Sequence, residues 1–258
     1  MRHALCPKAF WEEKPMSHIH LPDGVLPIWL WAAGFIGAIL VGIILIKLSK
    51  KEDFSRRLPL LGMMAAAMVL GASVEIVPIA YHVNLTVISG ILLGPSLIFL
   101  ATFVVNVILA LFGHGGITVI GLNTLILSIE GILGYLLFRL LWRGLKKLAP
   151  AVFLATFFAL FASTLSMIGV VSLGTSHYEE LIHREEGRGL FEFKLMKEKE
   201  DHQTEHGAQG EVHLKRFIII LLSLGLVGWL LEGVITSLIV RYIHRLRPDL
   251  LSLGGETS

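Results

Sequence analysis

The stretch Val25–Ile46, VLPIWLWAAGFIGAILVGIILI, contains no charged side chain and decides the class of fold. A transmembrane helix needs about 20 mostly apolar residues, because the hydrocarbon core is about 30 Å thick and a helix rises about 1.5 Å per residue. Val25–Ile46 meets that length, and so does a second uncharged stretch, Ala149–Leu173. These two segments predict a chain that crosses a membrane.

The composition of the whole chain supports the same prediction. Of 258 residues, 54% are hydrophobic and 16% are charged, whereas soluble globular proteins carry about 25% charged residues. The mean hydropathy is +0.74. The net charge of +2 gives no indication of a nucleic-acid partner, because the basic residues cluster beside the apolar segments. The single cysteine, Cys6, excludes an internal disulfide.

Apolar segments recur along the chain and predict an all-α integral membrane protein, a polytopic bundle of about seven transmembrane helices. We place the segments at Val25–Lys47, Leu58–Ala80, Leu85–Leu93, Pro95–Phe112, Ile117–Leu141, Ala149–Leu173 and Arg216–Tyr242. Leu85–Leu93 is too short to span a bilayer alone, so we expect it to be packed inside protein. If that segment is only re-entrant, the number of crossings is six.

The basic residues predict the orientation in the membrane. They cluster in Lys47–Arg57, Arg139–Lys147 and Arg241–Arg247, while the loops Tyr81–Asn84 and Gly113–Gly116 carry no Lys or Arg. Cytoplasmic loops are enriched in these residues. Seven crossings put all three clusters inside, with the N-terminus outside and the C-terminus in the cytoplasm, whereas six crossings break this agreement.

We expect a single membrane domain at residues 16–250. Residues 1–15 form an N-terminal extension without the apolar core of a signal peptide, and they are absent from the mature chain if translation starts at Met16. Residues 251–258 form a C-terminal tail. The polar stretch Gly174–Lys215 is rich in Glu and His, and we expect a flexible extracytoplasmic loop there.

Three segments that carry histidines fall on the outer face in this orientation: Met16–Gly24, Tyr81–Asn84 and Gly113–Gly116. Neutral imidazole is the commonest metal ligand, and it suits nickel, cobalt, copper and zinc. A single loop histidine is more often an ordinary polar residue at the membrane surface. The convergence of three such segments favours a transition-metal site.

Three sequence blocks resemble the CbiM/NikM family, the cobalt/nickel substrate-specific subunits of energy-coupling-factor (ECF) ABC transporters. His20–Leu26, HLPDGVL, resembles the N-terminal signature of the family. His82 precedes Gly90–Pro95 at the spacing of a second family histidine. Phe112–Thr124, FGHGGITVIGLNT, resembles the family's His-Gly-Gly block. The resemblance covers the chain from about His18 to Leu250.

The resemblance implies a metal site of nearly square-planar nitrogen geometry. Its donors in the family are the N-terminal amine, the amide and imidazole of the next histidine, and a loop histidine. The matching positions are His20 and His82, and this donor set favours Ni(II) or Cu(II) over Zn(II). Because His20 is not the second residue, two arrangements stay open. Either translation starts at Met16 and the amine and amides of Met16–His18 join the site, or the His18 imidazole replaces the amine.

Further polar residues near these blocks are supporting candidates. Glycines on both sides of His114 indicate a tight loop. We expect His114 to hydrogen-bond to a metal ligand, with direct ligation as the alternative. Asn84 and Asn123 are candidates for the same supporting role, against the alternative of an ordinary structural hydrogen bond.

Three glutamates, Glu75, Glu130 and Glu232, fall within apolar segments. Ionisable groups are costly inside a membrane and are candidates for function there. The sequence leaves open whether they relay protons or only make polar contacts between helices. It also leaves open whether the small residues Gly34–Gly42 of the first segment face a partner subunit or pack within this chain.

The leading hypothesis is a substrate-capture subunit of an ATP-driven Ni(II)/Co(II) importer in the cell (inner or plasma) membrane. The subunit would need no catalytic residue and no cofactor, and it lacks a phosphate-loop motif for ATP hydrolysis. The resemblance implies a transmembrane coupling (T) subunit and cytoplasmic ATPase subunits as partners, with a small accessory membrane subunit as an open addition. The alternative is a stand-alone secondary transition-metal/proton transporter. An intramembrane metalloenzyme is disfavoured, because His-Glu-x-x-His is absent.

Overall fold

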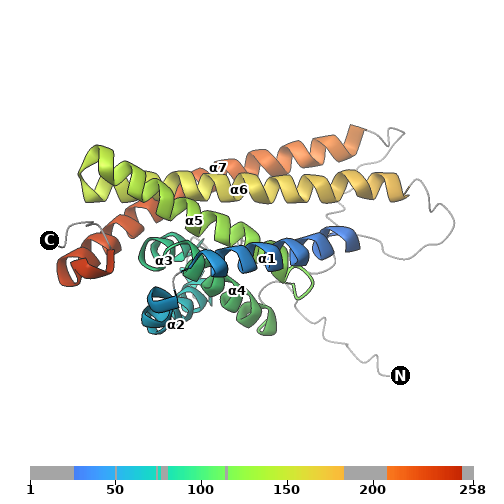
Figure 1. Cartoon of the computed structure of the whole chain (residues 1–258). Helices are drawn as coiled ribbons and strands as arrows, with labels where there is room; N and C mark the ends of the chain where they lie inside the picture. Colours follow the sequence, from blue (N-terminus) through green and yellow to red (C-terminus); the bar gives the residue numbers. More distant parts are fainter. Residues whose placement is uncertain are drawn as a thin grey trace, which may run out of the picture.

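The computed structural model describes residues 26–49, 51–73, 75–76, 81–113, 116–182 and 208–251. Seven α-helices form a bundle in this part of the chain, and the long helices α6 and α7 lie side by side (Figure 1). The elements are α1 (Ile28–Leu48), α2 (Lys51–Ser73), β1 (Glu75–Ile76), β2 (Tyr81–His82), α3 (Thr86–Leu93), α4 (Pro95–Leu111), α5 (Ile120–Leu145), α6 (Leu148–Ile182), α7 (Ala208–Leu246) and the short 3-10 helix η1 (Pro248–Leu251). The predicted all-α bundle of seven helices is confirmed.

Four helices of the described part are long and apolar enough to cross a bilayer. They are α1, α5, the part of α6 from Leu148 to Gly174, and the part of α7 from Gly225 to Leu246. Two shorter apolar helices accompany them, at Arg57–Ser73 of α2 and Pro95–Leu111 of α4. The chain is therefore a multi-pass membrane protein, as its composition predicts.

The dipeptide Gly94-Pro95 separates α3 from α4, as the sequence predicts. Gly94 has a φ of 79°, in the left-handed region that favours glycine. Pro95 is the first residue of α4, where its fixed φ suits a helix and its missing amide proton costs no hydrogen bond. The turn lets α4 begin directly after α3, and both helices pack against α5.

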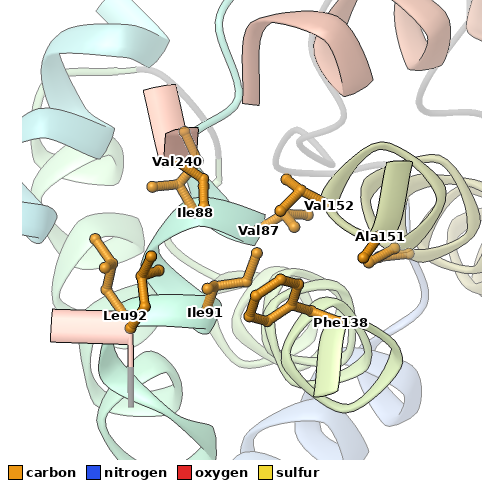
Figure 2. Packing of buried hydrophobic residues seen from close by; sticks show 11 residues of the cluster. Val87, Ile88, Ile91, Leu92, Phe138, Ala151, Val152 and Val240 are labelled. Atoms are coloured by element: carbon orange, nitrogen blue, oxygen red, sulfur yellow. The ribbon is translucent and has the colours of Figure 1, made fainter. Parts of the chain in front are cut away.

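Every residue of α3 is buried, so the prediction that this short segment packs inside protein is confirmed. Its apolar side chains point toward α5, α6 and α7 in the largest core cluster (Figure 2). The labelled residues are Val87, Ile88, Ile91 and Leu92 of α3, Phe138 of α5, Ala151 and Val152 of α6, and Val240 of α7. The backbone of α3 also touches α5, since a Cβ atom on Gly90 would lie 2.8 Å from the carbonyl carbon of Gly131.

The small residues of α1 pack within this chain. Gly34, Ala38 and Gly42 are buried. A Cβ atom on Gly42 would lie 2.9 Å from Cε1 of Phe99 in α4, and one on Gly34 would meet Leu122 in α5. Close approach of helices through small residues is the common way to pack them in membranes. Internal packing therefore accounts for this stripe, which the sequence alone left open.

The predicted second helix, Leu58–Ala80, is wrong at its C-terminal end. Helix α2 ends at Ser73, and Glu75 lies in β1, which pairs antiparallel with β2 so that Glu75 faces His82 in the register. Pro78 gives the physical reason, because proline lacks an amide proton and its ring disfavours the helical conformation of the preceding residue. Glu75 is therefore not a residue within a helix, as the sequence had indicated.

Helices α6 and α7 extend past the apolar segments Ala149–Leu173 and Arg216–Tyr242. They contain 35 and 39 residues. At about 1.5 Å per residue, each is about 50–60 Å long, which exceeds a hydrocarbon core of about 30 Å. Both helices therefore continue into the polar stretch Gly174–Lys215. The centre of that stretch, residues 183–207, lies outside the described residues.

Candidate metal site

The structure describes three of the six candidate site residues. His82, Asn84 and Asn123 lie in the described part, whereas His18, His20 and His114 lie outside it. The predicted meeting of His20 with His82 therefore stays a prediction. Among the described residues, no group of three or more His, Cys, Asp or Glu side chains is arranged to hold a metal ion. A site at His82 thus needs donors from elsewhere in the chain.

His82 is the last residue of β2 and lies in the connection that leads into α3. The residue is half-buried, and both imidazole nitrogens are out of contact with solvent. The neighbouring residue Val83 lies against α2, because a Cβ atom on Gly71 would be 2.7 Å from the Val83 carbonyl oxygen. His82 thus belongs to a short segment held against the helix bundle.

Asn84 attaches this segment to three places at once. Its side-chain nitrogen Nδ2 donates a hydrogen bond of 2.6 Å to Oε1 of Glu130 in α5. Its backbone amide donates a hydrogen bond of 3.3 Å to Oε2 of Glu232 in α7. Its side-chain oxygen Oδ1 accepts a hydrogen bond of 3.0 Å from the amide of Thr86, the first residue of α3. Asn84 thus fixes the segment that carries His82, and its supporting role at a metal site stays a prediction.

The two glutamates that accept hydrogen bonds from Asn84 lie inside the bundle. Glu130 and Glu232 are both 0% exposed. Ser163 of α6 lies beside the Glu130 carboxyl group, and Glu232 lies near it. Such a pair is expensive in a membrane interior, where charged groups find no water to stabilise them. Their retention beside the His82 segment marks this region as the polar centre of the bundle.

The depth of Asn84 in the bundle follows from its partner on α5. Glu130 lies ten residues after Ile120, the first residue of α5, which corresponds to about 15 Å along the helix axis. Asn84 is therefore level with the middle of α5. The sequence indicated a short loop on the outer face, whereas the structure places the start of α3 well inside the bundle.

The block Phe112–Thr124 connects the end of α4 to the first turn of α5. Gly113 has a φ of 76°, in the region that favours glycine. His114 and Gly115 lie outside the described residues, so the tight loop around His114 stays a prediction. Asn123 is buried in the first turn of α5. It lies seven residues before Glu130, about 10 Å along the helix.

Sequence reasoning missed the connection between the glutamates and Asn84. Glu130 and Glu232 stood out as acids within apolar segments, and Asn84 stood out beside a histidine. The sequence contains no signal that these three residues meet, because the two hydrogen bonds span 46 and 148 positions of the chain. Only the packing of α3 against α5 and α7 brings them together.

Comparisons with known proteins identify what the chain resembles. The family model CbiM, described as a cobalt uptake substrate-specific transmembrane region, matches residues 20–250. A cobalt transport protein CbiM of Geobacter sulfurreducens is 30% identical over 250 residues, which cover 93% of this chain and 64% of that protein. A cobalt transport protein CbiM of Sorangium cellulosum is 28% identical over 243 residues, with 90% and 94% covered. A crystal structure of a transition metal transporter has the same fold, with a TM-score of 0.67 at 20% identity over 88% of this chain and 93% of that chain.

Proposed function

The chain belongs to the CbiM family of cobalt uptake substrate-specific transmembrane regions, and we propose that it captures Ni(II) or Co(II) for an ATP-driven importer. Family membership makes it a multi-pass component of transition-metal uptake and not an enzyme. The observation that carries the proposal is the extent of the family match, which begins at His20 and includes His82. Both histidines that the sequence assigns to the metal thus fall within the matched region.

We propose His82 as one nitrogen donor and His20 as another, with His18 or an N-terminal amine completing the set. Imidazole is a neutral ligand suited to nickel and cobalt. Both nitrogens of His82 are out of contact with solvent, so a metal held there exchanges water for protein donors. The described part alone offers no complete site, which fits a ligand set that draws on the N-terminal segment.

Two arrangements of the N-terminal donors fit the sequence, and they differ in a measurable way. A chain that begins at Met16 presents a free amine two residues before His18. If that amine binds the metal, the chain beginning at Met16 will bind Ni(II) more tightly than the chain beginning at Met1. Equal affinity supports the arrangement in which the His18 imidazole takes the place of the amine.

We also propose supporting roles, an orientation and partners for the chain. His114 and Asn123 lie in the Phe112–Thr124 block and are proposed to orient metal ligands by hydrogen bonds. The basic clusters favour an outer N-terminus, an extracytoplasmic 174–215 segment and a cytoplasmic C-terminus. A transmembrane coupling subunit and cytoplasmic ATPase subunits would then dock at the inner end and drive release, and residues 16–250 act as one transport domain.

A stand-alone metal/proton transporter is not favoured. Asn84 donates one hydrogen bond to Glu130 and one to Glu232, which gives both acids a structural role in the bundle. The family description, a substrate-specific region, also fits one subunit of a larger importer better than a carrier that works alone. We therefore assign no proton pathway to these glutamates.

Uptake into proteoliposomes tests the proposed function. We expect ATP to drive Ni(II) or Co(II) uptake when the chain is reconstituted with its coupling and ATPase subunits. Uptake should persist when a protonophore collapses the proton gradient, because ATP hydrolysis supplies the energy. An ATPase-inactive subunit is the matched control and should abolish uptake. Uptake by the chain alone that stops with the protonophore would establish the secondary transporter instead.

A further inference from the structure

We propose that Glu130 and Glu232 form a buried clamp that positions His82 for the metal by fixing the segment between β2 and α3. This inference rests on the proposed function of the chain in metal capture. The clamp consists of one carboxyl group from α5 and one from α7, and both accept a hydrogen bond from the same residue, Asn84. The glutamates act through this residue, so they are positioning residues and not metal ligands.

The bonding pattern of Asn84 supports the clamp. The side-chain amide and the backbone amide of Asn84 are held by different helices, at 2.6 Å from Glu130 and 3.3 Å from Glu232. The side-chain oxygen holds the first amide of α3 at 3.0 Å. A residue bonded in this way can neither shift along the bundle nor rotate its side chain without breaking a bond. Asn84 therefore anchors the backbone two residues after His82.

Helix α2 also contacts the segment. A Cβ atom on Gly71 would lie 2.7 Å from the Val83 carbonyl oxygen, so α2 packs directly on the backbone between His82 and Asn84. The segment is thus in contact with α2 at Val83 and with the two glutamates at Asn84. A ligand fixed before the metal arrives loses less conformational freedom on binding, which raises affinity.

The charge and burial of the glutamates argue for a specific task. Helices in membranes can be joined by uncharged Ser, Thr or Asn at lower cost. Here two acidic side chains are kept near each other at 0% exposure. Each carboxyl group offers an oxygen that accepts a hydrogen bond, and here the two acceptors lie on different helices and share one donor residue, Asn84. This arrangement is useful where one loop residue must be held in a fixed place.

Direct binding of the metal by the glutamates is the competing explanation. The described structure does not favour it, because Glu130, Glu232 and His82 do not make a three-ligand group there. One oxygen of each carboxylate is also occupied by Asn84. The two explanations differ in what they require of residues 130 and 232. Positioning requires a hydrogen-bond acceptor, whereas ligation requires the negative charge.

Pairs of substitutions separate the acceptor from the charge. In Glu130→Gln and Glu232→Gln an acceptor oxygen remains, and we expect Ni(II) affinity within about threefold of the parent. In Glu130→Leu and Glu232→Leu the acceptor is lost, and we expect affinity to fall about 10-fold to 100-fold, as for other residues that orient a metal ligand. Thr236→Val, a buried substitution one turn from Glu232, is the matched control and should leave affinity unchanged.

A readout without metal tests the clamp independently of the proposed function. Hydrogen–deuterium exchange at the amides of residues 83–86 should speed up at least about 10-fold in the leucine variants and remain slow in the glutamine variants. Asn84→Ala removes the side-chain donor to Glu130 and the side-chain acceptor of the Thr86 amide, while the backbone donor to Glu232 and both carboxyl groups remain. It therefore supplies the same test of the Glu130 half of the clamp if Glu130→Leu does not fold. If His82→Ala leaves Ni(II) binding intact, the proposed metal site is wrong. The exchange measurement still tests the clamp in that case, because it is made without metal.

Two outcomes overturn the clamp. Leucine variants, or Asn84→Ala, with exchange and Ni(II) affinity like the parent show that the segment needs no such anchor. Glutamine variants that lose affinity as far as the leucine variants, while loop exchange stays slow, show that the carboxylates act on the cation by their charge.

Discussion

Replacing His82 with alanine should weaken Ni(II) and Co(II) binding by more than about 100-fold, beyond the 10-fold to 100-fold loss typical of residues that only support a ligand. The imidazole is the one donor that we assign outside the N-terminal segment, and alanine offers nothing in its place. Both nitrogens lie out of contact with solvent, so a water molecule does not readily take the vacated position. Titration calorimetry on the purified chain in detergent measures the loss.

His244→Ala is the matched control for this prediction. His244 is the other histidine whose side chain the structure describes, in the last turn of α7. It lies 12 residues beyond Glu232 on the same helix, about 18 Å along its axis. We expect His244→Ala to bind Ni(II) like the parent, and His20→Ala to lose binding as His82→Ala does. Retained binding in both His20→Ala and His82→Ala would contradict the assigned site.

The fold could be predicted from sequence wherever length and hydropathy decide it. The short segment before Gly94-Pro95 shows this best, because a helix of eight residues cannot span a bilayer and must bury its backbone in protein. The end of α2 could not be placed by hydropathy, since residues 74–80 are also mostly apolar. Pro78 was the signal that mattered there, and a proline rule applied residue by residue would have found it.

The candidate site was predictable in its residues but not in its contacts. Its position beside His82 singled out Asn84, and the cost of buried charge singled out Glu130 and Glu232. Their meeting depends on the close approach of α3 to α5, which glycines permit at Gly90 and Gly131. A single sequence shows that glycines stand at these two positions. It does not show which helix each one faces, because the same spacing serves internal packing and subunit contacts equally well.

Substituting Gly90 with alanine should destabilise the protein more than any surface change, by about 1–3 kcal/mol or more. A Cβ atom at this position would overlap the carbonyl oxygen of Gly131 and lie 2.8 Å from its carbonyl carbon. Both are backbone atoms of α5, so no side chain can turn aside to make room. Helix α3 must then separate from α5. We expect the unfolding temperature in detergent to fall by about 5 °C or more.

Gly62→Ala is the control that separates this clash from the loss of glycine itself. Gly62 lies in α2 with no atom within 4 Å of the added methyl group. Alanine also favours a helix over glycine by up to about 1 kcal/mol, so Gly62→Ala should be neutral or slightly stabilising. An equal effect of both substitutions would show that α3 does not contact α5 as closely as described.

The same substitution should also weaken metal binding, because Gly90 connects the packing of α3 to the position of His82. Helix α3 begins at Thr86, whose amide is bonded to Asn84. Moving α3 away from Gly131 therefore pulls Asn84 from Glu130, and with it the backbone that carries His82. We expect Gly90→Ala to lower Ni(II) affinity at temperatures where the variant is still folded, whereas Gly62→Ala should not. Destabilisation by Gly90→Ala with unchanged affinity would show that the position of α3 does not control the His82 segment.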